Sequence, residues 1–331
     1  NRLDEIVYYK SLTKDEMRKI VDLQLADLRS RMDEGKHLNL DVTTAAKDYI
    51  IDSAYDSVYG ARPIKRFIQS RVETLIAKAI IQGRYAEGST LTVVQVVRGD
   101  AEDGVSANLT RIRAAEGAHV VLVQVQLLGS HARRWNAVAI EEATSARVEQ
   151  VRIELGGAVV ACGTRTLLNH NKCEYDLDAV YFGHGSDVLD FNDVSVHTGK
   201  DTLCEMHTAG VLTGHADKIL RGTVDFQRGA KRGVGHESED VLLFSPNARN
   251  RTAPLILCGE EEVEGQHAAS VGRLDENKLY YLRSRGLSEA QARRLMVDAR
   301  FAPAIDKIPL ESLQDEVREN VAGRLNDELD G

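Results

Sequence analysis

The chain of 331 residues contains no run of about 18 apolar residues, so we expect no membrane-spanning helix. It also lacks any Cys-x-x-Cys pair, which argues against a zinc ribbon and a thioredoxin-type redox motif. The cysteines are few and lie at Cys162, Cys173, Cys204 and Cys258. Scattered cysteines without a recognisable signal peptide are typical of reduced thiols, so we expect a cytoplasmic protein.

Basic charge is scarce relative to acidic charge. The net charge of −9 argues against a general nucleic-acid binder. The two signs nearly balance up to residue 100, so the acidic excess lies in the remainder. The chain also lacks a G-x-x-x-x-G-K-[ST] phosphate loop and an apolar strand that ends in paired acids. We therefore expect that the chain is not an enzyme, and that alone it neither binds nor hydrolyses ATP.

The first hundred residues have the periodicity of a helical module that ends in a strand. Thr13 and Glu16 predict a capping box, and apolar residues follow it at helical spacing. Pro63 fits the first turn of a later helix. The predicted elements are helices over about 13–35, 43–53 and 63–83 and a strand over 91–97.

Two short motifs flank this helical module. Residues 1–5 read NRLDE and residues 59–63 read YGARP. With the capped helix and the closing strand, they make the segment 1–98 resemble the C-terminal small domain of the second AAA+ module of ClpB-type disaggregases. The resemblance implies that Arg62 is a sensor of the γ-phosphate and that Arg2 is an arginine finger on a neighbouring subunit's nucleotide, roles that suit a guanidinium. It also implies self-association through residues 1–98.

The missing phosphate loop leaves a second interpretation of those two arginines open. Arg62 is then a helix-start residue and Arg2 a solvated charge. In this isolated segment the second interpretation is the one we favour.

After residue 105 the apolar pattern changes to that of short strands, which Gly, Asn and Asp residues separate. No helical stretch of useful length precedes residue 275, and the only prolines there are Pro246 and Pro254. This pattern argues against an α/β sheet, and it leaves a sandwich, a barrel and a β-solenoid open. The predicted strands are 110–113, 119–128, 137–141, 148–155, 173–182, 188–197, 203–211, 219–226 and 241–244.

Beyond residue 275 the pattern becomes helical again. Ser288 and Gln291 predict a second capping box at the start of a helix. A last amphipathic helix carries apolar residues at three- and four-residue steps over 310–325. This apolar stripe serves either core packing or docking, and the sequence does not separate the two.

A pair of motifs links the strands to this helical tail. Residues 266–275 read QHAASVGRLD, and residues 279–286 read LYYLRSRG. With these motifs, the region from about residue 110 to 309 resembles SufD of the SufBCD iron–sulfur assembly scaffold. The related SufB usually has an acidic residue after the histidine, so Ala268 favours SufD.

Together the two resemblances imply a multidomain chain. They predict a mainly α (α+β) AAA+ small domain, a right-handed parallel β-helix (β-solenoid) and a small C-terminal helical domain. They imply a non-catalytic scaffold whose β-helix pairs with a SufB-like partner and whose helical domain docks a SufC-like ATPase. The predicted boundaries are 1–98 for the small domain, 99–108 for a linker or seam, 109–272 for the β-helix and 273–331 for the helical domain.

The SufD resemblance also implies that His267 faces the interface at which a transient iron–sulfur cluster forms. An imidazole is a sound ligand for iron. Cys258 is a weaker metal candidate: some SufD proteins have a cysteine two residues before this histidine, but that position is Gly265 here. A lone histidine is also often a structural residue, and each cysteine is also interpreted as a small buried hydrophobe.

Two other hypotheses stay open for the whole chain. One is a fragment of a ClpB-type ATP-dependent disaggregase in which residues 1–98 sense nucleotide. The other is an artificial fusion of two gene fragments with neither activity, joined near residues 91–108. A full SufD has more β-helix before the part matched here, so we expect uncapped first coils with exposed strand edges.

Overall fold

The change from helical to strand periodicity along the chain produces two units of different architecture. The first is Asn1–Ala86 and the second is Glu87–Gly331. Each is described by itself below. The structure, a computed structural model, describes residues 14–36, 44–54, 62–68, 71, 90–99, 104–273 and 276–330.

The first unit is helical in its described residues. Its helices are α1 (Lys14–Lys36), α2 (Thr44–Ala54) and α3 (Arg62–Phe67). The apolar faces of all three helices meet in one core, in which Val21, Ile51 and Ile64 are buried. An ion pair between Arg18 Nε and Asp48 Oδ1, at 2.7 Å, links α1 to α2. The first two predicted helices are confirmed, whereas most of the third beyond residue 68 lies outside the described residues.

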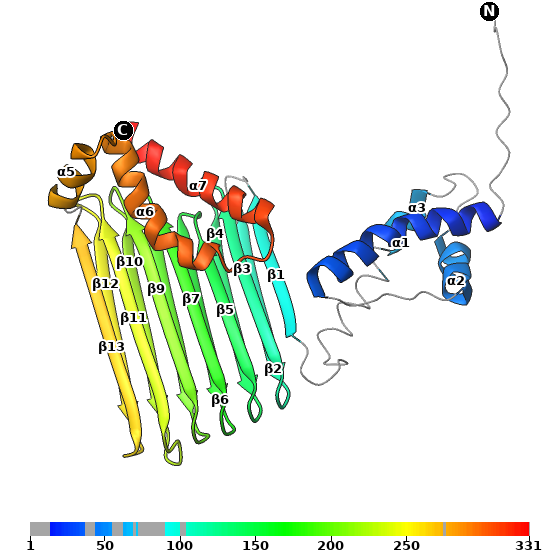
Figure 1. The fold of residues 1–331 in the computed structure, drawn as a ribbon, viewed down its shortest axis with the longest axis horizontal. Helices are drawn as coiled ribbons and strands as arrows, with labels where there is room; N and C mark the ends of the chain where they lie inside the picture. Colours follow the sequence, from blue (N-terminus) through cyan, green and yellow to red (C-terminus); the bar gives the residue numbers. More distant parts are fainter. Residues whose placement is uncertain are drawn as a thin grey trace, which may run out of the picture. The chain divides into compact units, whose positions relative to one another are not determined.

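Thirteen strands of the second unit alternate between two sheets (Figure 1). The seven-stranded sheet contains, in spatial order, β1 (Thr90–Gly99), β3 (His119–Leu128), β5 (Arg147–Glu154), β7 (Glu174–Gly183), β9 (Leu203–Leu212), β11 (Gly233–Leu243) and β13 (Val263–Arg273). The six-stranded sheet contains β2 (Val105–Ala114), β4 (Arg133–Glu142), β6 (Val159–Leu168), β8 (Val188–His197), β10 (Asp217–Phe226) and β12 (Arg249–Cys258).

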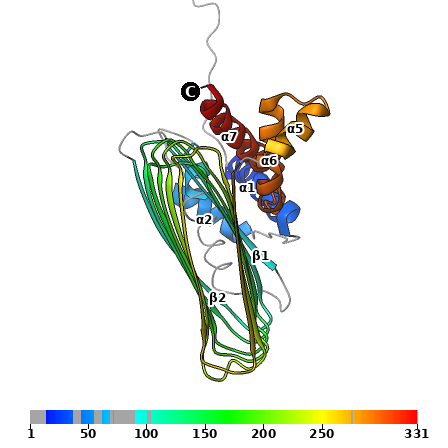
Figure 2. The same cartoon turned by 90° about the vertical axis from the view of Figure 1, so that its left-hand side faces the viewer.

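All pairs between the described strands are parallel, and each strand pairs with the next but one along the chain. Arg133 therefore pairs with Val159, and Asp217 pairs with Arg249, one coil further on. Figure 2 shows the result from the side, with two layers of strands joined by tight turns. Of the three architectures that the strand pattern left open, the β-solenoid is confirmed.

Turns on one edge of the solenoid stack on one another and fix the length of each coil. Ser145, Lys172, Asp201 and Arg232 have φ near 60°, the left-handed region that is uncommon for non-glycine residues. The backbone N–H of Ser145 donates to the carbonyl of Asn171 at 2.9 Å, and the following turns repeat this contact. Hydrogen bonds between the turns of successive coils thus extend the hydrogen-bond ladders of the two sheets through the turns that connect them.

The strand prediction missed β6, β12 and β13 and gave β11 only its last residues. β12 contains Pro254, and proline is tolerated on an edge strand because one of its sides carries no ladder. β13 is also an edge strand, and its residues are mostly polar or small. The predicted strand over 91–97 is β1, which pairs with β3 in the solenoid, so the boundary predicted at residue 98 falls within a solenoid strand.

The helical tail comprises α5 (Glu276–Ser284), α6 (Glu289–Ile305) and α7 (Glu311–Asp330). The capping box of Ser288 and Gln291 is confirmed at the start of α6. α6 and α7 lie across the outer face of the seven-stranded sheet (Figure 1). The apolar stripe over 310–325 packs into this core through its buried residues, while Leu310 is 51% exposed. The stripe therefore serves core packing.

Candidate functional site

The interior of the solenoid between the two sheets carries a row of polar side chains, many of which hydrogen-bond to one another. The Nε2 of Gln150 donates to Gln124 Oε1 at 3.0 Å, and the Tyr175 hydroxyl donates to Gln150 Oε1 at 2.8 Å. Arg152 forms two parallel hydrogen bonds with Asp193, at 2.8 and 2.7 Å. Both partners of this ion pair are almost fully buried. Each charge is thus compensated at the cost of its desolvation.

The buried cysteines belong to this closed interior. The Cys162 thiol donates to Glu154 Oε1 at 3.3 Å, and burial raises the pKa of Cys162 well above its usual value. Burial also raises the pKa of Cys173 to about 11 and raises the pKa of Cys204. A thiol must lose its proton to bind a metal, so these three cysteines act as small buried side chains.

Another buried ion pair lies one coil from the end of the solenoid. The ammonium of Lys218 donates to the carboxylate of Glu239, and to Asn250 Oδ1 at 2.9 Å. The hydroxyl of Thr252 donates to the other carboxylate oxygen of Glu239. Burial lowers the pKa of Lys218, and the adjacent Glu239 opposes that shift. Both oxygens of Glu239 are therefore occupied by donors.

Glu237 lies two residues before this satisfied carboxylate and is different. Its side chain faces the interior and the residue is only 6% exposed. Its Oε2 atom is buried and has no hydrogen-bond partner among the described residues. Burial raises the pKa of Glu237 to about 7, and the carboxylates of Glu239 and Asp193 add to that effect. The fold thus buries a carboxylate oxygen that no described residue hydrogen-bonds.

His267 lies on β13, at the edge of the seven-stranded sheet, and is exposed. Its register partner on β11 is Glu237. Side chains of register partners in a parallel pair lie on the same face of the sheet, about 4.8 Å apart along the hydrogen-bonding direction. Since Glu237 faces the space between the two sheets, His267 lies at the inward-facing position of the last coil. We call this last part of the solenoid, from β11 to β13, the open end.

Cys258 also lies at the open end, as the exposed last residue of β12. It is not at the level of His267. An added Cβ at Gly265 would lie 2.8 Å from Ile256 Cγ2, so these two residues face each other across the coil. Along the coil, Ile256 therefore lies between Cys258 and the position opposite His267. The structure therefore does not bring the two metal candidates together.

The predicted nucleotide residues are not placed by the structure. Arg2 lies outside the described residues, and Arg62 is described only as the first residue of α3, without its side chain. Within the described ranges, no group of three or more His, Cys, Asp or Glu side chains could hold a metal ion. His267 supplies one nitrogen donor at the open end, so a cluster bound there would need further ligands.

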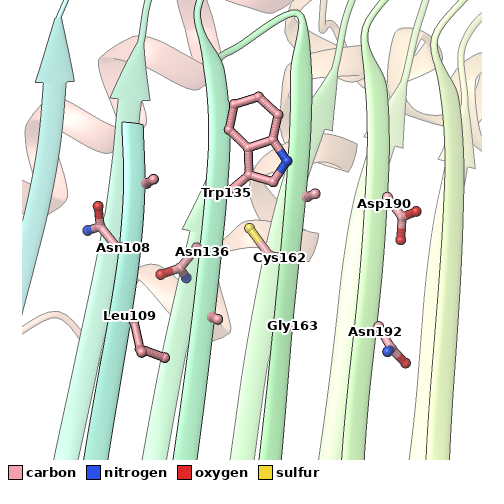
Figure 3. Close-up of a pocket in the computed structure, with 11 residues that line it drawn as sticks. Asn108, Leu109, Trp135, Asn136, Cys162, Gly163, Asp190 and Asn192 are labelled. Carbon is pink, nitrogen blue, oxygen red and sulfur yellow. The ribbon is translucent and has the colours of Figure 1, made fainter. Parts of the chain in front are cut away.

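The outer face of the six-stranded sheet has a surface depression of about 490 Å³ (Figure 3). Its lining includes Leu109, the 44% exposed Trp135, and the polar side chains of Asp190 and Asn192. Small residues such as Ala137 form its apolar floor. No predicted site residue lines it.

Sequence reasoning missed Glu237. The strand prediction began only at residue 241, so the inward alternation of Glu237, Glu239 and Val241 was not recognised. The signal that finds it is the coil length: Glu237 and His267 are 30 residues apart and therefore one coil apart in the ladder. None of the helices in the described part of the chain combines the length and the apolar character needed to cross a bilayer.

Two family profiles match the chain. The family described as "SUF system FeS cluster assembly, SufBD core domain" matches residues 69–300. The family described as "C-terminal, D2-small domain, of ClpB protein" matches residues 12–93. The resemblance of the two segments to these two families is thereby confirmed.

Curated relatives divide in the same way. The iron-sulfur cluster assembly protein SufD of Bacillus subtilis (strain 168) is 33% identical over 139 residues, which cover 42% of this chain and 32% of the relative. Chaperone protein ClpB 1 of Parasynechococcus marenigrum (strain WH8102) is 47% identical over 106 residues, which cover 32% of this chain and 12% of the relative. Chaperone protein ClpB 1 of Thermosynechococcus vestitus is 46% identical over 93 residues, which cover 28% of this chain and 11% of the relative.

The chain thus spans about a third of the SufD relative and about an eighth of these ClpB relatives. The SufBD core profile covers most of the chain and includes every strand of the solenoid. This protein therefore belongs to the family of SUF-system iron–sulfur cluster assembly proteins that share the SufBD core domain.

Proposed function

We propose that the chain is a SufD-like, non-catalytic scaffold subunit of iron–sulfur cluster assembly. It works in the cytosol with a SufB-like and a SufC-like partner, and a transient cluster forms at its open end. The solenoid is right-handed, as the family resemblance implies. The observation that carries this proposal is the exposed, inward-facing His267 on the last strand of the solenoid.

The edges of the open end support pairing with a partner. Among the described strands, β12 and β13 each have a neighbour on one side only. A free edge presents unpaired backbone donors and acceptors, which another chain's strands can satisfy. Inward-facing positions on this coil include Pro254 and Ile256 opposite the strand that holds His267. A partner seated there would bring its own side chains beside the imidazole.

The helical tail supports a separate docking site for the SufC-like ATPase. Tyr280 and Tyr281 on α5 are 76% and 55% exposed, and Leu295 on α6 is 49% exposed. Aromatic residues are enriched in the buried centres of protein interfaces. The opposite side of α6 is fixed to the sheet by the buried Phe301. The exposed side of these helices can therefore bind a partner while the buried side stays packed against the solenoid.

Co-expression with SufB-like and SufC-like proteins tests the scaffold proposal. We expect the three chains to elute as one complex and to bind an iron–sulfur cluster under anaerobic reconstitution, detected by its visible absorption and by iron and sulfide content. Elution of this chain alone, with a cluster forming equally well on the partners without it, would contradict the proposal.

A second candidate function concerns the N-terminal segment, because the ClpB small-domain profile matches residues 12–93. In this candidate, Arg62 senses the γ-phosphate of a bound nucleotide, Arg2 acts as an arginine finger on a neighbouring subunit's nucleotide, and residues 1–98 self-associate. Titration of the chain with ADP and a slowly hydrolysed ATP analogue, followed by sedimentation, tests it. Nucleotide-dependent association supports this candidate, and an unchanged monomer at all nucleotide concentrations rejects it.

A further inference from the structure

The open end holds two inward-facing groups with complementary chemistry. Glu237 and His267 are register partners on β11 and β13. Adjacent parallel strands lie about 4.8 Å apart, so side chains on the same face of register partners are within reach of one ligand. One group is a carboxylate and the other an imidazole. The two residues come from successive coils, so the geometry of the ladder holds them together.

The carboxylate of Glu237 is available for a ligand. Its Oε2 atom has no hydrogen-bond partner among the described residues, although the residue is 6% exposed. Native proteins rarely leave a buried polar atom unpaired, so such an atom is a candidate for contact with a ligand or for a functional role. Glu239, two residues on, shows the alternative, because Lys218 and Thr252 occupy both of its oxygens.

The opposite sheet leaves room for this carboxylate. A Cβ added at Gly222 of β10 would lie 1.8 Å from Glu237 Oε1 and 2.1 Å from its Cδ. Any side chain at that position would displace the carboxylate. The absence of a side chain at Gly222 therefore leaves space for the Glu237 carboxylate inside the solenoid. Glu237 lies there one coil before the inward-facing position of His267.

We propose that Glu237 and His267 form half of a binding site for a divalent transition-metal ion at the open end. Imidazole nitrogen and carboxylate oxygen are suitable donors for Fe²⁺ and its neighbours in the first transition row. Solvent or a partner subunit completes the coordination. The inference deepens the scaffold proposal and rests on it for the cargo, since it adds a second residue of this chain to the site at which iron would enter.

A titration of the full chain with Co²⁺ tests the site, because Co²⁺ takes the same donors as Fe²⁺ and resists oxidation in air. Calorimetry gives the affinity, and the d–d absorption of bound Co²⁺ reports its ligand environment. We expect one weak site whose Kd rises at least about tenfold in His267→Ala and in Glu237→Gln. Gly222→Ala keeps both ligands but displaces the carboxylate, and it should weaken binding as well.

His236→Ala is the matched control. His236 precedes Glu237 on the same strand, faces outward, and contacts Glu205 Oε1 at 2.8 Å. The control should bind Co²⁺ like the unmodified chain. Unchanged affinity in both His267→Ala and Glu237→Gln, in folded protein by circular dichroism, overturns the inference, and so does a loss confined to His236→Ala.

The cluster experiment separates this inference from the scaffold proposal. Loss of Co²⁺ binding in the two variants, with normal complex formation and normal cluster content, would keep the metal site and reject a role for His267 in cluster assembly. Normal Co²⁺ binding in the variants, with cluster assembly lost in His267→Ala, would keep the function and reject Glu237 as a ligand.

Discussion

The middle coils of the solenoid and its open end follow the same strand register, but their buried charged side chains differ in their hydrogen-bond partners. In the middle coils, Arg152 and Asp193 meet through two short hydrogen bonds. At the open end, Glu237 is also buried and keeps an oxygen without a partner in the described residues. The Arg152–Asp193 ion pair is complete within one chain, whereas Glu237 keeps one oxygen free for a ligand. Glu142 and Glu154 in the middle coils also each have one buried oxygen that no described residue hydrogen-bonds, so what distinguishes Glu237 is its place beside His267.

The largest effect on stability is expected in the middle coils. Asp193→Ala leaves the Arg152 guanidinium buried without its carboxylate, and such a loss costs about 4 kcal/mol. Urea denaturation followed by circular dichroism measures it. The control Arg147→Ala removes a partly exposed ion-pairing residue and should cost less than about 1 kcal/mol. Equal losses in both variants would remove the distinction between interior and surface charge.

The helices that cover the middle coils should show an effect of similar size. Phe301 on α6 is fully buried against the seven-stranded sheet, and Phe301→Ala should cost about 3–4 kcal/mol because it leaves a cavity. Thermal or urea unfolding measures the loss. Tyr280→Ala, on the exposed side of α5, is the control and should change stability little. A small loss in Phe301→Ala would mean that the helices are not part of the core.

A smaller, pH-dependent effect is expected at Glu142 of β4. Burial raises the pKa of Glu142 to about 9, above the ordinary value of 4.5, and Thr166 donates to its Oε1 atom at 3.2 Å. The protonated form is therefore favoured by folding, so its stabilisation is full below pH 4.5 and is lost as the pH rises through 9.

Glu142→Gln removes this titration. The unmodified chain should lose on the order of 2 kcal/mol relative to the variant between pH 5 and pH 8. Denaturation curves at several pH values measure the difference. Parallel pH profiles for the two chains would show that this carboxylate is not buried in the folded state.

The smallest effect on stability is expected at the open end. Glu237→Gln keeps the shape of the side chain and removes a charge that no described residue pairs. Its free energy of unfolding at pH 7 should therefore lie within about 1 kcal/mol of the unmodified chain. Urea denaturation at pH 7 checks it. A loss of unfolding free energy as large as that of Asp193→Ala would show that Glu237 belongs to the structural network, and would contradict the difference between the open end and the middle coils.

Much of the fold could be predicted from particular residues. The β3 and β8 segments were predicted with their observed bounds, because their apolar residues and flanking turns are clear. The capping box of Ser288 and Gln291 was also predictable, since it depends only on local sequence. β12 and β13 were not, because an edge strand needs few apolar residues and its existence depends on the coil before it.

The candidate site was only half predictable. His267 came from a motif shared with a family, and its role stays a prediction. Glu237 could not be found from local sequence, since an acidic residue between polar neighbours is typical of an exposed strand or turn. Its importance arises from the ladder that places it beside His267, and from the missing side chain at Gly222 across the coil. These are contacts between residues far apart in the sequence.

The cluster content of the reconstituted complex tests the central claim most directly. His267→Ala and the outward-facing control His236→Ala should both fold and assemble with the SufB-like and SufC-like partners. We predict that iron and sulfide content falls severalfold in His267→Ala and stays at the unmodified level in His236→Ala. Equal cluster content in both variants would contradict the assignment of function to the open end.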